Sequence, residues 1–157
     1  PWIVVGALRF RARNAAWSGV AFRFDGSMQE GYLNYLIRYL LVAPSLGLAY
    51  PYVRHCQRAY INGEHRFGTT RFTFGGSVAA FYRIYGFAVL ALVCCLAGFV
   101  AALIALMFLA NLFLPAFPPS FAEYAPLPLL YLALLPAWCF LTSRLTNLSF
   151  NATRLGD

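Results

Sequence analysis

Few side chains in this sequence could do chemistry, and Arg38 is the most costly of them to place. Arg38 lies inside an apolar segment, where a guanidinium costs about 2.5–3.5 kcal/mol on membrane-insertion scales and is functional by default. The nearest acidic residues, Asp25 and Glu30, are its expected partners. Arg38, Asp25 and Glu30 are therefore a candidate substrate or ion path. The alternative is that Arg38 snorkels to an interface, because it follows Tyr32 closely.

A second group of candidates is basic, with Tyr and Phe residues interleaved. Its members are Arg54, Arg58, Arg66, Arg71 and Arg83. Such a cluster can be a topology signal, a site for anionic lipid headgroups or a partner, or a nucleic-acid surface. Anionic membranes attract each juxtamembrane arginine by about 1 kcal/mol. We expect a topology signal or a lipid or partner contact, and we expect no nucleic acid.

His55, Cys56 and His65 raise the question of a metal site. They lack the repeated spacing of metal ligands, and the fourth ligand would have to come from Glu64 or Asp25. Glu64 and His65 could also form an acid–base pair, but adjacency in sequence does not establish geometry. The sequence contains no metalloprotease, nucleophile-elbow or phosphate-loop motif. We therefore predict no catalytic residues, no metal, no cofactor and no enzyme activity.

The element that dominates the chain is an apolar stretch from Ile84 to Leu114 without a charged residue. It is longer than the roughly 20 residues that cross a bilayer, and it has no polar helical face. The composition agrees: 61% of the residues are hydrophobic and the net charge is +7. All of the basic residues are arginines. The excess favours the positive-inside rule, with the arginines on the cytoplasmic side.

Before this stretch, the pattern predicts a strand, a turn and a broken apolar segment. Alternation over Trp17–Phe24 predicts a short strand, Asp25-Gly26 a turn, and Ser27 with Glu30 a capping box. A helix should start near Met28. The segment Tyr32–Val53 is apolar but contains Pro44 and Pro51, which interrupt a helix. We interpret it as a re-entrant helix–turn–helix with Pro44–Gly47 at its deepest point, or as one kinked span.

The remaining segments alternate between polar and apolar. Residues 54–83 should form a helix ending at Asn62-Gly63, a strand or hairpin over Phe67–Phe74, and a helix capped by Ser77. A proline-rich loop follows the long stretch. Leu127–Thr142 should be a further span, kinked at Pro136 and preceded by prolines suited to a first helical turn.

A short internal repeat links the two halves. Phe22-Arg23-Phe24-Asp25-Gly26-Ser27 recurs as Phe72-Thr73-Phe74-Gly75-Gly76-Ser77, and both copies precede an apolar helix. Neither strand can satisfy its backbone alone, so we predict that both belong to one small β-layer on the cytoplasmic side. A weaker repeat relates Tyr60–Glu64 to Phe150–Asp157.

The predicted fold is a mainly α-helical polytopic membrane protein with two full spans, one proline-broken re-entrant or kinked apolar segment and short cytoplasmic β-strands. We expect residues 1–157 to form a single membrane domain that is part of a longer chain. Its first half would comprise a cytoplasmic strand and turn (13–31), the re-entrant or kinked segment (32–53) and a basic cytoplasmic loop with the second Phe-x-Phe strand (54–83). Its second half would comprise a span (84–114), a periplasmic loop (115–126), a span (127–143) and the cytoplasmic start of a candidate second repeat (144–157).

The combined motifs resemble the YjgN-like family of bacterial inner-membrane proteins. The resemblance rests on Arg13-Asn14 with Trp17, Phe22–Ser27, Tyr50-Pro51-Tyr52, Arg58 with Tyr60 and Asn62, His65–Thr70, Phe72 with Phe74, and Asn147–Asp157. It implies a multi-pass inner-membrane protein of unestablished function, with a membrane-associated metallopeptidase as a candidate partner. The family offers no catalytic residues to carry over.

Together, the residues and the resemblance favour a non-enzymatic scaffold or adaptor in the bacterial inner membrane, in contact with the lipid bilayer and anionic headgroups. Two alternatives stay open. One is a transport or permeation module that uses the proline-broken segment and Arg38, since broken helices in repeats mark transporter sites. The other is an accessory subunit of a membrane protease.

Overall fold

The computed structural model describes residues 1–113 and 126–156. These residues fall into two compact units, and each is considered by itself. One unit comprises Pro1–Arg83 with Leu145–Asp157, and the other comprises Ile84–Arg144. The predicted periplasmic loop at 115–126 lies outside the described residues except for its last position, where a helix begins.

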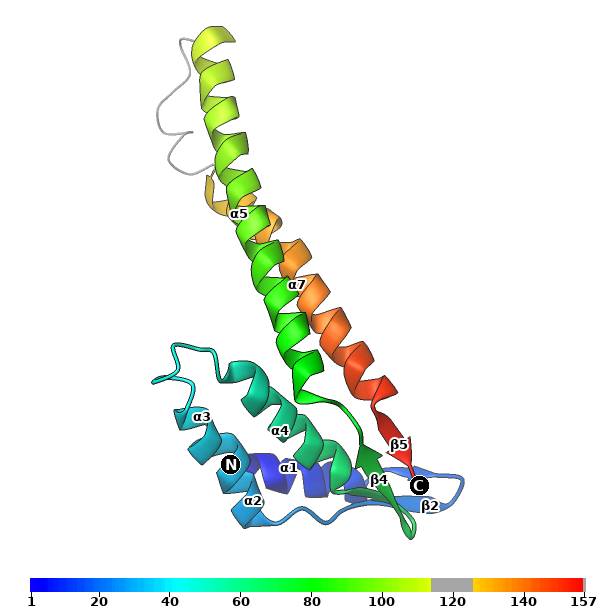
Figure 1. The fold of residues 1–157 in the computed structure, drawn as a ribbon. Helices are drawn as coiled ribbons and strands as arrows, with labels where there is room; N and C mark the ends of the chain where they lie inside the picture. The colour runs from blue at the N-terminus through cyan, green and yellow to red at the C-terminus, as the bar shows by residue number, and fades with distance from the viewer. Residues whose placement is uncertain (114–125, 157) are drawn as a thin grey trace. The chain divides into compact units, whose positions relative to one another are not determined.

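The first unit contains all the strands and the short helices (Figure 1). Its strands are β1 (Ala16–Trp17), β2 (Val20–Phe24), β3 (His65–Phe67), β4 (Thr70–Phe74) and β5 (Thr153–Leu155). Its helices are α1 (Trp2–Arg13), α2 (Met28–Tyr32), the π-helical turn η1 (Leu33–Ile37), α3 (Arg38–Leu40) and α4 (Tyr50–Gly63). Two long helices, α5 (Val78–Phe113) and α7 (Pro126–Asn151), start or end in this unit and form the second one.

The strands form one antiparallel five-stranded sheet in the order β1-β2-β3-β4-β5. Both Phe-x-Phe segments belong to it, so the prediction that they share one sheet is confirmed. The two segments do not pair with each other, because β3 lies between them. Phe22 is opposite Phe67 on β3, and the Phe22 ring also stacks near Phe72 on β4, with 6.5 Å between centroids.

The internal repeat is structural, and it is larger than the sequence motif. Each copy is a strand, a helix, a second helix and a returning strand: β2, α2, α4 and β3 in the first, and β4, α5, α7 and β5 in the second. Equivalent backbone hydrogen bonds close both copies. The Asp25 amide donates to the Glu64 carbonyl at 3.0 Å, and the Gly75 amide to the Ala152 carbonyl at 2.8 Å.

Each copy contains the same corner between strand and helix. Ser27 caps α2 by accepting a hydrogen bond from the Glu30 amide, and Ser77 accepts one from the Ala80 amide at the start of α5. Both predicted caps are confirmed. The predicted strand at residues 17–24 is a hairpin, β1 with β2, because Ser18 and Gly19 adopt positive φ and turn the chain.

The core of the first unit lies between the sheet, α1 and α4. Val5, Ala12, Phe24 and Tyr60 are buried together. The ring of Phe24 meets that of Tyr60 edge-on, with 5.6 Å between centroids. This packing fixes the corner after β2 against the end of α4, which is where the polar side chains converge.

The predicted polytopic fold with two full spans is wrong. In the described part of the chain, one helix is long and apolar enough to cross a membrane, at Val78–Leu109. The predicted second span, residues 127–143, is the first part of α7. That helix contains Pro136 and continues through Arg144 to Asn151, so it does not end at an apolar boundary.

The predicted re-entrant segment also has a different environment. Tyr32–Val53 forms two short helical arms joined by a turn at residues 41–49. The first arm follows α2, which packs against α1, and the second continues into α4, which packs against β4. Contacts within the sheet unit therefore hold this segment.

Candidate functional site

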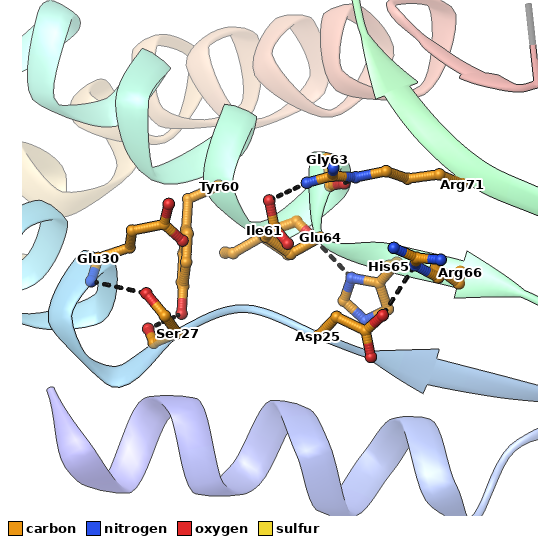
Figure 2. Close-up of polar contacts among 10 residues, drawn as sticks. All are labelled: Asp25, Ser27, Glu30, Tyr60, Ile61, Gly63, Glu64, His65, Arg66 and Arg71. Atoms are coloured by element: carbon orange, nitrogen blue, oxygen red, sulfur yellow. Dashed lines mark hydrogen bonds and ion pairs between the residues drawn. The ribbon is translucent and has the colours of Figure 1, made fainter.

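A polar cluster occupies the place where the loop from β2 to α2 meets the turn from α4 to β3 (Figure 2). The fold brings it together from two distant stretches because β2 pairs with β3. Asp25 contributes a carboxylate from the first stretch. Its Oδ2 lies 2.7 Å from Arg66 Nε and its Oδ1 lies 3.1 Å from Arg23 Nε. Arg66 Nε has no hydrogen-bond partner within the described residues, so its contact with Asp25 is an ion pair of imperfect direction.

Glu64 and Arg71 form the second ion pair of the cluster. Arg71 Nε also donates to the Gly63 carbonyl at 2.7 Å. Arg66 and Arg71 are directly opposite each other on β3 and β4. Two facing guanidinium groups repel, and the two carboxylates offset that repulsion. These interactions fix the sheet register and leave Asp25 and Glu64 engaged.

Tyr60 ties α4 to the capped corner. Its hydroxyl donates a hydrogen bond to the Ser27 carbonyl at 2.8 Å. Burial, with a smaller contribution from the negative charge of Glu30, raises the pKa of Tyr60 to about 12. A phenol with so high a pKa stays protonated and keeps donating at neutral pH. Tyr60 therefore has a positioning role in the corner.

The two histidines bind different backbone carbonyls and do not share a site. His65 Nδ1 lies 2.5 Å from the Ile61 carbonyl, and His55 Nε2 lies 2.7 Å from the Gly76 carbonyl. The His55 ring also meets Phe81 edge-on, with 5.3 Å between centroids. Within the described residues, no group of three His, Cys, Asp or Glu side chains could hold a metal ion.

The predicted path of Arg38, Asp25 and Glu30 is not assembled in the first unit. Arg38 donates a hydrogen bond to Asn34, one helical turn earlier. Asn34 is itself buried and donates to the Glu30 carbonyl at 2.9 Å. No ion pair joins Arg38 to either carboxylate in the part of the chain that the structure describes. The contact of Arg38 with Asn34 could not be predicted from the sequence, because Asn34 is uncharged and does not stand out as a partner for an arginine.

The predicted basic cluster separates into engaged and free arginines. Arg66 and Arg71 belong to ion pairs, and Arg54 donates to Gln57 at 3.1 Å. Arg58 and Arg83 are the free members of the predicted cluster. The structure also shows free arginines that the predicted cluster did not contain. Arginines without a hydrogen bond or ion pair to any described residue are Arg11, Arg13, Arg58, Arg83 and Arg154.

These free arginines all belong to the first unit. Arg83 is exposed and immediately precedes the apolar stretch of α5. Arg11 and Arg13 end α1, and Arg154 lies on the edge strand β5. The signal in the sequence was the shortage of acidic residues, which leaves most arginines without a possible ion-pair partner.

In the second unit, α5 and α7 enclose an open apolar groove of about 440 Å³. Its lining is Phe99, Ala102, Leu103, Leu106, Leu132 and Ala133. It presents no titratable side chain, so it offers no acid, base or nucleophile. The most apolar part of α5 is 0% buried by the rest of the chain. Its surface is therefore free to contact an apolar environment such as lipid.

A comparison with known families gives one result. A family model described as a bacterial protein of unknown function, DUF898, matches residues 1–157. Neither a curated protein nor a solved structure matches the chain.

Proposed function

Because the chain belongs to the DUF898 family of bacterial proteins of unknown function, we propose that it is a non-enzymatic scaffold or adaptor anchored in the bacterial inner membrane by α5. The YjgN-like proteins are this same family, so the resemblance inferred from the sequence is confirmed. The coarser conclusion is membrane association, which the long apolar helix indicates. In addition, we assign the scaffold or adaptor role to the unit that contains the sheet.

The observation that carries the proposal is the set of free arginines on the unit from which α5 departs. Arg83 follows Tyr82 and directly precedes Ile84, the first residue of the apolar stretch. Aromatic and basic residues at this position are typical of a membrane interface. Arginines that no carboxylate neutralises can contact anionic headgroups, each with about 1 kcal/mol. The sheet unit would therefore lie on an anionic leaflet.

The same charges orient the chain. Basic segments next to a membrane helix stay on the cytoplasmic side, and the sheet unit carries the free arginines on both sides of α5 in sequence. In this proposal the sheet lies in the cytoplasm. A cysteine at exposed Thr69, between β3 and β4, would then react with an impermeant maleimide only after the cells are permeabilised.

The scaffold role is supported by how the polar cluster is used. Asp25 and Glu64 neutralise arginines on adjacent strands, and Tyr60 and His65 donate to backbone carbonyls. Tyr60 and Asp25 tie the corner after β2 to α4 and β3, and Glu64 ties the end of α4 to β4. A stable, basic surface at a membrane suits the binding of other components better than turnover of a substrate.

Lipid selectivity measured by spin-label spectroscopy tests the proposal. The full chain is reconstituted with spin-labelled phosphatidylglycerol or phosphatidylcholine, and the fraction of immobilised lipid gives the relative affinity. We expect preference for phosphatidylglycerol, weakened by salt. Arg83→Gln should lower the selectivity by up to about fivefold.

A matched control removes charges without changing the net charge. Arg71→Gln combined with Glu64→Gln deletes an ion pair, and selectivity should stay at the level of the unmodified chain. Equal selectivity for both lipids, or equal losses in the Arg83 variant and the control, would contradict the proposal.

A further inference from the structure

The two helical arms and turn of residues 28–63, which we name the finger, end in an exposed apolar tip. Leu46 is 93% exposed, Leu48 75% and Leu40 66%. Ile37 and Leu41 are exposed beside them. Five large exposed apolar residues within twelve positions of one segment favour an interaction site over an ordinary scatter of surface leucines.

Most backbone amides of the tip have partners within the segment, which lowers the cost of leaving water. Ser45 serves two backbone groups: its hydroxyl donates to the Val42 carbonyl at 3.1 Å and accepts from the Ala49 amide at 3.0 Å. The other amides that donate to carbonyls within the turn are those of Leu41, Val42, Ser45, Leu46, Gly47, Leu48 and Tyr50. Most amides of the turn therefore need no water as a hydrogen-bond acceptor.

The choice of residue at the turn is consistent with an apolar environment. Leu46 has a φ of 51°, in the left-handed region where an aqueous turn would favour Gly or Asn. A leucine accepts that conformation here and points outward. Its exposed side chain therefore gains nothing from packing within the first unit.

Charged and aromatic residues frame the tip as they do at a bilayer surface. No charged residue lies between Arg38 and Arg54. The rings of Tyr39 and Tyr50 meet edge-on between them, with 6.4 Å between centroids. Long basic side chains can then remain in the headgroup layer while the leucines lie deeper.

The sheet topology directs the finger and α5 from the same end of the sheet. Strands β2 and β4 are parallel to each other because each is antiparallel to β3. Each leads through a Gly-Ser corner into a capped helix. His55 on α4 contacts Phe81 on α5, three residues before the apolar stretch begins at Ile84. From His55, α4 extends only about 7.5 Å to Tyr50 at the tip.

We propose that the tip of the finger inserts into the headgroup–acyl boundary of the leaflet that α5 enters, and so forms a second, interfacial membrane contact. This inference rests on the proposed anchoring by α5. The expected depth is about 5–10 Å, as for interfacial helices. Such a contact would hold the sheet unit at a fixed height on the membrane.

Fluorescence quenching tests the depth directly. The native cysteines are replaced, and an environment-sensitive NBD label is attached at Leu46→Cys or Leu48→Cys in the full chain. Vesicles of phosphatidylcholine and phosphatidylglycerol contain lipids with a nitroxide either near the headgroup or near the chain end. We expect blue-shifted emission and strong loss of intensity with the shallow nitroxide. A label at Thr69→Cys, at the opposite end of the sheet, should show neither effect.

The outcomes separate the inference from the proposed anchoring. If the chain floats with the vesicles but both tip labels behave like the Thr69 label, the interfacial contact is refuted and the anchor stands. Stronger quenching by the deep nitroxide would refute the shallow placement. A chain that does not float with the vesicles would overturn the anchor, and the tip contact with it.

Discussion

Gly26 and Gly76 show how single residues set the corners of the repeat. A Cβ at Gly26 would lie 2.5 Å from the ring of Phe24, and one at Gly76 would lie 2.5 Å from the ring of Phe74. Each glycine lies two residues after the phenylalanine that covers it. The repeated Phe-x-Gly pattern therefore has a packing cause: the ring folds over the turn and leaves no room for a side chain.

Gly26→Ala should destabilise the sheet unit. Phe24 is 5% exposed and cannot move aside easily, so the overpacking should cost about 1–3 kcal/mol. Thermal unfolding in detergent measures the loss. Gly6→Ala is the control, because no atom lies within 4 Å of a Cβ there, and alanine favours the helix. If both substitutions have the same effect, the packing explanation is wrong.

Tyr60 should make the sheet unit sensitive to alkaline pH. Its pKa is raised from 10.0 to about 12 in the folded chain, so the unfolded chain loses this proton first. The associated stability is complete below pH 10 and is lost as the pH rises to about 12. We expect the stability of Tyr60→Phe to fall less over this range, and to be lower by about 1 kcal/mol near neutral pH, because the bond to Ser27 is absent. An unchanged decline would assign the alkaline loss to other groups.

At the scale of elements, local signals were predictable and pairings were not. The caps at Ser27 and Ser77 could be predicted because a capping bond joins residues three positions apart in the sequence. The place of β3 between the two Phe-x-Phe strands depends on contacts such as Phe22 with Phe67, which no local pattern encodes. The ion pairs of Arg66 and Arg71 follow from that register, so they could not be predicted either. The predicted second span was wrong because, among the described residues, α5 alone is long and apolar enough to cross a membrane.

The return of the chain to the sheet can be tested by a crosslink between β4 and β5. Thr73 is directly opposite Arg154, and both side chains are exposed. Cysteines at these positions, in a chain without its native cysteines, should form a disulfide on mild oxidation. Non-reducing electrophoresis after cleavage between the strands detects it.

The control pair uses Thr73 and Arg23. Arg23 is level with Arg71 across the sheet, so Arg23 and Thr73 are farther apart than two strand spacings, about 9.5 Å. A disulfide needs Cα atoms within about 7 Å. We expect no bond. Efficient crosslinking of this pair, with none between Thr73 and Arg154, would mean that the Phe-x-Phe strands pair directly and that the observed strand order is incorrect.

At the scale of the whole molecule, the composition predicted a membrane environment correctly in outline but did not predict the arrangement of the helices and strands. The charge-free stretch after Arg83 and the excess of arginine both indicated a membrane, and α5 is long and apolar enough to cross one. The duplicated strand–helix–helix–strand unit was visible only as a short motif. The two copies differ greatly in helix length. Their equivalence is therefore recognised from the strand pairing and not from the apolar pattern.

Oxygen and nickel-chelate accessibilities along α5 test the membrane anchor most directly. Spin labels are placed, in the reconstituted full chain, at four exposed positions: Phe87, Val93, Val100 and Met107. Oxygen concentrates at the centre of a bilayer and the chelate is excluded from it. We predict that the ratio of oxygen to chelate accessibility is low at Phe87, next to Arg83, and rises along the apolar stretch of α5 to Val93 and Val100. A ratio that is uniform and water-like at all four positions would contradict the account.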